Sequence, residues 1–192
     1  MNIQEAIHGV FGAWRLLHFD RTGLQHFQTT PTAFWNSFWA AAIVLPADGI
    51  ATLLLSTPPT GDTTLPDTIH TVLVYLEIYA IQWLLFPLVM VAFVETIQRS
   101  ERFELFIVAW NWSNIVRAAI LLPGIAIFAS QGPESAGWGA SVYMAAIVIT
   151  FIYAGFVARA ALDVSPMTAT MVVLTEVGLA ILLWISAQTL IG

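Results

Sequence analysis

GWGASVYMAAIVITFIYAGFVARAAL, residues 137–162, contains one charged side chain, that of Arg159, among mainly apolar neighbours. A helix that crosses the hydrocarbon core of a bilayer needs about 20 consecutive, mainly apolar residues, and this stretch is long enough. Irregular backbone would leave peptide groups without hydrogen-bond partners in lipid, whereas a helix pairs them internally. The sequence therefore predicts a transmembrane helix over residues 137–162.

Four other stretches share this apolar character and are separated by segments rich in polar and turn-forming residues. They cover residues 33–55, 69–94, 103–129 and 167–190. Two starts carry a hydroxyl residue followed by proline, at Thr30 and Pro31 and at Ser165 and Pro166, the order favoured at helix N-termini. We predict an all-α polytopic membrane protein whose domain of residues 33–192 is a bundle of five transmembrane helices.

The composition supports this class and excludes several others. Of 192 residues, 58% are apolar and 9% are charged, whereas about a quarter of the residues in a soluble domain are charged. Six arginines without any lysine are too few and too scattered for binding nucleic acid. The absence of cysteine excludes disulfides, thiolate metal sites and cysteine catalysis. The predicted partner is the lipid bilayer, and nucleic acid is excluded.

The arginines also predict the orientation of the helices. Five of them fall on one side of the membrane if the chain crosses it five times: Arg15, Arg21, Arg99, Arg102 and Arg159. The opposite side receives Asp62, Asp67 and Glu134 and no basic residue. Because positive charge is enriched in cytoplasmic segments, we predict a cytoplasmic N-terminus and a periplasmic C-terminus in a bacterial inner membrane.

Residues 1–32 form a separate N-terminal segment with an amphipathic pattern. Apolar residues recur at helical spacing, at Ile3, Ile7, Val10, Phe11, Trp14 and Leu17. This pattern predicts a helix that lies in the cytoplasmic interface and ends near Gly23. A helix packed under the loops of the bundle fits the pattern equally well.

Ionisable and polar side chains occur inside the predicted spans. A charged group near the centre of a spanning helix costs roughly 2.5–3.5 kcal/mol, so such groups normally face the bundle interior and find partners there. We predict an intramembrane polar network formed by seven residues: Asp48, Glu77, Asn111, Ser113, Asn114, Arg117 and Glu176. Arg117 and the neighbouring amides offer hydrogen-bond donors to a carboxylate from Glu176, Glu77 or Asp48.

Two interpretations of this network are open. It is either a buried structural cluster that fixes helix rotation and register, or the polar lining of a binding pocket or proton path. Three acids and one base would leave net negative charge in a dry interior, so at least one acid is expected to be protonated or exposed to water.

Motifs for enzymatic chemistry are missing from the sequence. It contains no phosphate loop, nucleophile elbow, zinc-binding His-Glu helix or glycine-rich dinucleotide turn. His70, at the edge of a span, is too isolated to suggest a metal or haem site. We therefore predict neither an enzyme nor a bound cofactor or metal.

Two short motifs carry a resemblance to a known family. FWNSFWAA at residues 34–41 and NWS at residues 111–113 resemble a group of small alphaproteobacterial membrane proteins that is grouped with the Yip (Ypt-interacting protein) family. Over roughly residues 30–190, the resemblance implies five spans with a cytoplasmic N-terminus. Eukaryotic relatives are associated with Rab GTPases and membrane trafficking through a long N-terminal region that has no equivalent here. The resemblance therefore implies no functional residues.

The leading interpretation of the function is a non-enzymatic inner-membrane protein. It would act as a scaffold, an assembly factor or a partner of another membrane component or of a second copy of itself. The alternative is a small channel or proton-coupled permease that uses the intramembrane Asp, Glu and Arg residues. A water-accessible cavity that connects Asp48 and Glu77 to the outer face would favour the permease, and a dry pair of Arg117 with a carboxylate, without a cavity, would favour the scaffold.

Overall fold

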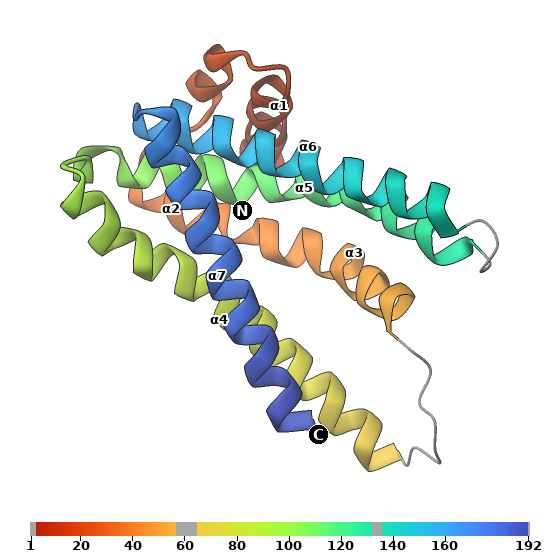
Figure 1. Ribbon diagram of the computed structural model, residues 1–192. Coiled ribbons are helices and arrows are strands. Elements are labelled where there is room, and N and C mark those ends of the chain that lie inside the picture. The colour runs from red at the N-terminus through yellow and green to blue at the C-terminus, as the bar shows by residue number, and fades with distance from the viewer. Residues whose placement is uncertain (1–2, 57–64, 132–135, 192) are drawn as a thin grey trace.

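The computed structural model of the protein describes residues 3–56, 65–131 and 136–191, and within these ranges it contains helices and no strand (Figure 1). The α-helices are α1 (Ile3–Leu17), α2 (Pro31–Ser37), α3 (Trp39–Leu55), α4 (Leu65–Thr96), α5 (Phe103–Ser130), α6 (Ala136–Leu162) and α7 (Pro166–Ile191). Two short 3-10 helices, η1 (Arg21–His26) and η2 (Ser100–Arg102), lie in the connections.

Five helical segments are long and apolar enough to cross a membrane. They are Pro31–Leu55, which comprises α2 and α3, and Thr68–Thr96, Ser100–Ser130, Gly137–Leu162 and Pro166–Leu190. The predicted all-α fold with five spans is thereby confirmed. The first span contains a turn at Phe38, which the sequence pattern did not predict.

The predicted start signals act as helix caps. The Thr30 hydroxyl accepts a hydrogen bond from the Ala33 backbone N–H at 3.1 Å, and Pro31 begins α2. The Ser165 hydroxyl accepts one from the Thr168 backbone N–H at 3.2 Å before α7. Each cap satisfies a backbone donor that has no partner within the first turn of the helix.

The transmembrane helices form two pairs that diverge. Figure 1 shows α5 alongside α6 and α4 alongside α7, with the two pairs close together at one end and separated at the other, and with α3 between them. The α4–α5 and α6–α7 connections lie at the closed end. The molecule is therefore a wedge with its wide side at the opposite end.

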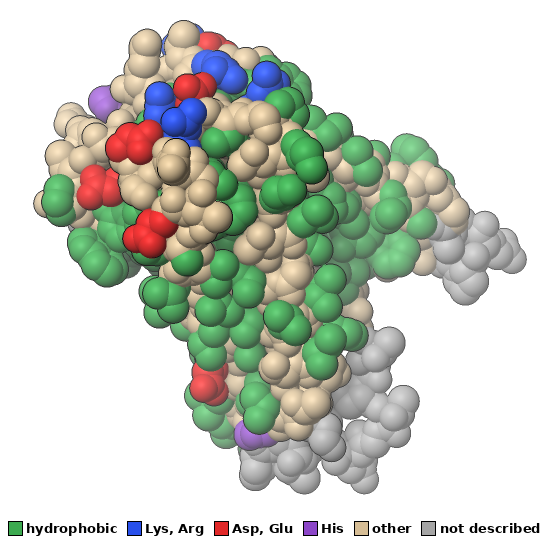
Figure 2. All heavy atoms as spheres, turned by 60° about the vertical axis from the view of Figure 1, so that its left-hand side comes forward, with side chains coloured by type: hydrophobic (Ala, Val, Ile, Leu, Met, Phe, Trp, Pro, Cys, Tyr) green, Lys and Arg blue, Asp and Glu red, His purple; other side chains and the backbone are tan. Residues whose placement is uncertain are grey.

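The closed end carries the arginines other than Arg117, and we call it the arginine end. Three of them meet at the residue after α6: Arg21 Nη1 lies 3.8 Å from Asp163 Oδ1, and Arg102 Nη2 lies 3.9 Å from Asp163 Oδ2. Arg99 donates a hydrogen bond to the Asp163 carbonyl oxygen at 3.4 Å. Figure 2 shows charged side chains gathered at this end above a largely apolar surface. The structure thus places arginines that are distant in sequence on one side of the bundle.

The hydrophobic core lies mainly toward the arginine end. Helix α1 contributes the fully buried Ala13 and Leu16, and the halves of α4, α5, α6 and α7 that converge there contribute Met90, Val94, Phe106, Ile107, Val157, Leu162 and Val172. This packing seals the bundle at the arginine end and leaves the wide end less tightly filled.

Helix α1 packs on the bundle through three small residues and Leu16, whose side chain is fully buried. Gly9, Gly12 and Ala13 are buried, and a Cβ added to Gly9 would lie 2.5 Å from the Trp112 ring of α5. Of the predicted apolar face, Ile3, Ile7, Phe11 and Trp14 are exposed, whereas Val10 and Leu17 are half-buried against the core. The exposed side chains fit the predicted helix at the membrane interface, and the buried ones fit the alternative of a helix packed against the bundle.

The predicted end of α1 near Gly23 is wrong. The helix ends at Leu17, and Phe19 adopts a positive φ of 59° that turns the chain back toward η1. Gly23 lies in η1 and packs so closely on α1 that a Cβ there would be 2.5 Å from the Gly12 carbonyl oxygen. Glycine therefore marks a close contact between two segments here, and the helix end lies six residues earlier.

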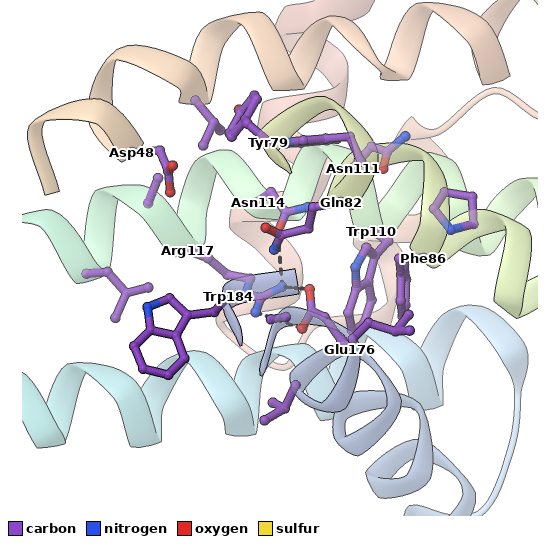
Figure 3. Close-up of a pocket in the computed structure, with 18 of the residues that line it drawn as sticks. Asp48, Tyr79, Gln82, Phe86, Trp110, Asn111, Asn114, Arg117, Glu176 and Trp184 are labelled. Carbon is purple, nitrogen blue, oxygen red and sulfur yellow. Dashed lines mark hydrogen bonds and ion pairs between the residues drawn. The ribbon is translucent and has the colours of Figure 1, made fainter. Parts of the chain in front are cut away.

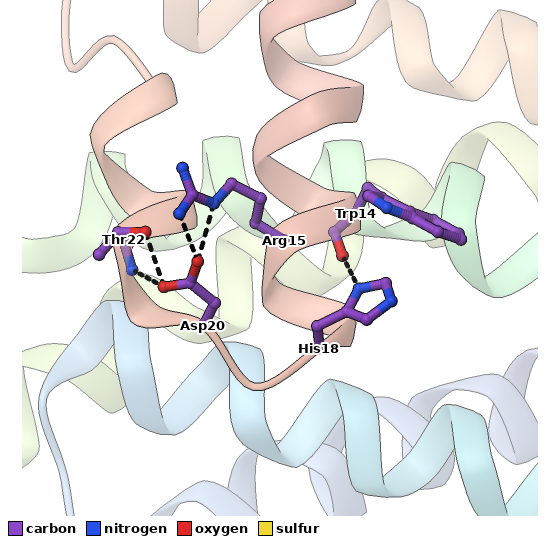
Figure 4. Close-up of polar contacts among 5 residues, drawn as sticks. All are labelled: Trp14, Arg15, His18, Asp20 and Thr22. Carbon is purple, nitrogen blue, oxygen red and sulfur yellow. Dashed lines mark hydrogen bonds and ion pairs between the residues drawn. The ribbon is translucent and has the colours of Figure 1, made fainter.

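A polar turn follows α1 (Figure 4). Asp20 Oδ2 accepts hydrogen bonds from Arg15 Nε at 2.8 Å and Nη2 at 2.5 Å, and Asp20 Oδ1 accepts hydrogen bonds from the Thr22 hydroxyl at 2.6 Å and backbone N–H at 2.9 Å. These hydrogen bonds, with those from Thr22 contributing most, lower the pKa of Asp20 from 3.8 to about 2. The carboxylate therefore stays ionised and holds the turn.

Candidate functional site

A bidentate ion pair joins α5 and α7 inside the bundle. Arg117 Nη1 donates a hydrogen bond to Glu176 Oε1 at 2.7 Å, and Nη2 donates one to Oε2 at 2.9 Å (Figure 3). Arg117 Nη1 also donates one to Asn114 Oδ1 at 2.9 Å. Each side chain of the pair is 15% exposed. Two parallel N–H···O bonds to a carboxylate fix the guanidinium more firmly than a single contact would.

Helical spacing explains why these groups meet. Residues 110, 114 and 117 are separated by four and three positions, so their side chains project from one face of α5. The Arg117 guanidinium lies over the Trp110 ring at 5.5 Å from its centroid, and the other side of that ring stacks on Phe86 of α4 at 5.0 Å. The positive charge of Arg117 is thus balanced by a carboxylate, an amide oxygen and an aromatic face.

The ion pair lines a cavity of about 500 Å³ to which helices α3 to α7 all contribute. Its polar lining includes Asp48, Gln82, Asn111, Asn114, Arg117 and Glu176. Typical ligand sites in proteins have volumes of about 300–1,000 Å³ and combine an apolar wall with a few polar groups. Both the volume and the lining of this cavity fall within that description.

Asp48 lies on the α3 side of the cavity, and the ion pair lies on the α5 and α7 side (Figure 3). The Tyr75 hydroxyl of α4 donates a hydrogen bond to Asp48 Oδ2 at 2.7 Å. The Tyr79 hydroxyl donates one to the Ala41 carbonyl oxygen of α3 at 2.7 Å. These two bonds connect α3 to α4 and hold one carboxylate at the cavity wall.

Two of the predicted network residues connect helices near α1. Asn111 Nδ2 donates a hydrogen bond to the Ser37 hydroxyl at 2.9 Å, and Asn111 also lines the cavity. The Tyr153 hydroxyl of α6 lies 3.0 Å from the Ser113 hydroxyl, to which it is hydrogen-bonded. The same Tyr153 hydroxyl donates a hydrogen bond to the Ala13 carbonyl oxygen of α1 at 2.8 Å. Ser113 therefore belongs to a buried junction of α1, α5 and α6 that is separate from the cavity.

Glu77 lies apart from the other predicted network residues. It is exposed on α4 and does not line the cavity. Two residues along a helix correspond to about half a turn, so Glu77 projects away from the face that carries Tyr75 and Tyr79. Of the three carboxylates predicted as possible partners of Arg117, Glu176 is the one that pairs with it. The cavity reaches Asp48 but not Glu77.

Several lining residues have no counterpart among the predicted site residues. They are Tyr79, Gln82, Trp83, Phe86, Phe151 and Trp184. The α4 aromatics at positions 75, 79, 83 and 86 recur every three or four residues, a spacing that places them on one helix face. Gln82 is a polar residue inside a span. Both signals are present in the sequence, whereas nothing in the sequence distinguishes Trp184 from aromatics near the membrane surface.

Among residues 3–56, 65–131 and 136–191, no group of three or more His, Asp or Glu side chains is arranged to hold a metal ion. Asp62 and Glu134, which were predicted to lie on the side opposite the arginines, are outside the described residues. No protein-family model, curated protein or solved structure matches the chain. The resemblance to the Yip family stays a prediction, and the geometry of the cavity is the basis for a functional assignment.

Proposed function

We propose that this protein is a non-enzymatic membrane protein of the permease type that binds a small solute in the cavity between its two helix pairs. The observation that carries this proposal is the position of the Arg117–Glu176 ion pair in the wall of a cavity of about 500 Å³. Intramembrane ionisable residues commonly mark solute or proton pathways. An ion pair that only fixed the register of α5 and α7 would need no adjoining space.

The shape of the bundle supports the same function. The core toward the arginine end closes the inner side of the cavity. At the other side, Trp184 lines the cavity and is 63% exposed. A solute would thus enter from the wide end and meet the ion pair near the middle of the bundle.

The direct test is ligand-induced stabilisation of the purified protein in a non-ionic detergent. Wild-type protein is heated with each member of a panel of small amines, carboxylates, sugars and neutral apolar molecules, and the shift in Tm is recorded. The cavity-filling variant Ala118→Phe changes a lining residue. Its matched control, Ala126→Phe, adds the same ring to an exposed position of the same helix.

The proposal expects at least one compound to raise the Tm of wild-type protein and of Ala126→Phe, with the shift lost in Ala118→Phe. A shift that persists in Ala118→Phe would mean that binding occurs elsewhere. A panel without any shift in wild-type protein would count against a binding cavity.

A scaffold is the second candidate, and the contacts of Arg117 with Glu176, Asn114 and Trp110 favour it. In that case the bundle serves as a partner of another membrane component, and the ion pair is purely structural. Copurification in mild detergent, with mass spectrometry of the bound proteins, distinguishes the two. A stable companion protein together with no ligand-induced shift would favour the scaffold.

The proposed location is a bacterial inner membrane, with the arginine end in the cytoplasm. The clustering of arginines at one end of the bundle supports this orientation through the enrichment of positive charge in cytoplasmic segments. The N-terminus would then lie in the cytoplasm and the C-terminus in the periplasm, with the cavity open toward the periplasm.

A further inference from the structure

The charges that line the cavity are unbalanced. Asp48 and Glu176 contribute two carboxylates, and Arg117 contributes one guanidinium. Arg117 is bound to both oxygens of Glu176, so these two charges compensate each other. Asp48 accepts a hydrogen bond from the neutral Tyr75 hydroxyl and has no cationic partner among the described residues. One formal negative charge is therefore left at the α3 side of the cavity.

An anionic solute is a poor fit for this lining. The positive group that would attract it is the Arg117 guanidinium, and its charge is already compensated by the bidentate contact with Glu176. A negative group near Asp48 would also meet like-charge repulsion that is strong in a medium of low dielectric constant. A bare metal cation fits poorly as well, since no group of three or more ligating side chains occurs in the described part of the chain.

Aromatic rings form much of the remaining wall. They belong to Tyr79, Trp83, Phe86, Trp110, Phe151 and Trp184. Trp110 is covered on its two sides by Phe86 and by the Arg117 guanidinium. Trp184 is 63% exposed, and Figure 3 shows it on the far side of the ion pair from Trp110. Ring faces such as that of Trp184 attract an organic cation and also provide apolar contact for its body.

We propose that the cavity binds an amphipathic organic cation, with its positive group directed to Asp48 and its apolar body against the aromatic wall. This inference rests on the proposed function and adds the chemical class of the solute. The excess carboxylate, the charge-compensated guanidinium and the aromatic lining together select this class. The Arg117–Glu176 pair then acts as a neutral polar wall, and Asp48 is the residue that recognises charge.

Binding of tetraphenylphosphonium to the protein in dodecyl maltoside tests the proposal, with isothermal titration calorimetry as the measurement. Tetraphenylborate serves as the anion of the same shape. The variant Asp48→Asn removes the proposed recognition charge and keeps the side-chain size, and Asp48→Glu keeps the charge. The control Glu77→Gln removes a carboxylate that is exposed on α4, outside the cavity.

The proposal expects tetraphenylphosphonium to bind wild-type protein, Glu77→Gln and Asp48→Glu. In Asp48→Asn the Kd should rise by about tenfold or more, because a desolvated charge pair near an aromatic wall is lost. Tetraphenylborate should bind at least about tenfold more weakly than the cation. Thermal unfolding of Asp48→Asn, measured without ligand, checks that the variant is folded.

Equal binding of the cation and the anion, or an unchanged Kd in a folded Asp48→Asn, would overturn the choice of a cation. The proposed function would survive that result if another compound still gave a Tm shift that Ala118→Phe abolishes. Absence of binding for both tetraphenyl ions and for the whole panel would contradict the cavity function itself.

Discussion

Arg117 and Glu176 compensate each other's charge in an environment of low dielectric constant. Replacing one partner leaves an uncompensated buried charge, which is more harmful than losing the pair. We expect Arg117→Gln or Glu176→Gln alone to lower the free energy of unfolding by about 3 kcal/mol. The double variant should lose less than either single variant. Reversible unfolding in mixed micelles measures all three, and additive losses in the double variant would contradict a coupled pair.

Asp20 should show an acid transition that is shifted downward. Its pKa is lowered to about 2 in the folded protein, against 3.8 for an unperturbed Asp. A lowered folded-state pKa means that the stabilising contribution is complete above about pH 3.8 and is lost as the pH falls through about 2. The chemical shift of the Asp20 carboxyl carbon, followed by NMR, should have its midpoint near pH 2. Thr22→Val should raise that midpoint, whereas a wild-type midpoint near 3.8 would contradict the structure.

The sequence predicted that Arg117 would find a carboxylate, but it offered three candidates in Glu176, Glu77 and Asp48. Helical periodicity alone could have excluded Glu77 as the partner, because Glu77 lies about half a turn from Tyr75 and Tyr79. The choice between Glu176 and Asp48 depends on how α5 crosses α3 and α7, and this crossing arises from packing that local sequence patterns do not specify.

Among the helices, α1 differs most from its sequence pattern. Its bulky apolar stripe predicted a face turned either to the membrane interface or to the loops of the bundle, and the face that packs on the bundle is the one with Gly9, Gly12, Ala13 and Leu16. Small residues allow a close approach between helices, and the large Trp112 of α5 fills the space above Gly9. The five spans were predictable because twenty or more apolar residues have few alternatives in lipid. A helix of fifteen residues with apolar groups on both faces does not have this constraint.

This packing predicts that alanine substitutions at two helical glycines change the free energy of unfolding in opposite directions. Gly→Ala within a helix normally stabilises by roughly 0.5–1 kcal/mol. Gly9→Ala should instead lower stability by about 1–3 kcal/mol, because its Cβ would lie 2.5 Å from the Trp112 ring. Gly178→Ala is the control, since a Cβ there meets nothing within 4 Å. Thermal unfolding in detergent measures both, and a Gly9→Ala variant as stable as Gly178→Ala would contradict the position of α1.

At the scale of the whole molecule, two helix pairs converge at the arginine end and diverge toward the other end (Figure 1). The buried core closes the first end, and the cavity with Arg117, Glu176 and Asp48 lies where the pairs separate. The uneven distribution of arginines and most polar residues of the cavity could be predicted from the sequence. The cavity itself could not, because its volume depends on the angles between helices that are distant along the chain.

In this architecture the two ends of the molecule differ in how far water can enter between the helices. Water should reach the cavity from the wide end and should be blocked at the arginine end by the core. The chain has no cysteine, so single cysteines can be introduced into an otherwise unreactive protein. A thiol reacts as the thiolate and therefore needs water around it, which makes its labelling a measure of wet surface.

The most direct test labels such variants in bacterial spheroplasts with a charged, membrane-impermeant methanethiosulfonate reagent. Ala180→Cys lies in the cavity lining, Ala145→Cys lies on the exposed apolar surface of α6, and Gln98→Cys lies at the arginine end. We predict that Ala180→Cys reacts from outside, that Gln98→Cys reacts only after the membrane is permeabilised, and that Ala145→Cys stays unreactive in both conditions. An Ala180→Cys that stays unreactive even after permeabilisation would contradict a cavity open opposite the arginine end, and a Gln98→Cys that is labelled in intact spheroplasts would contradict the proposed orientation.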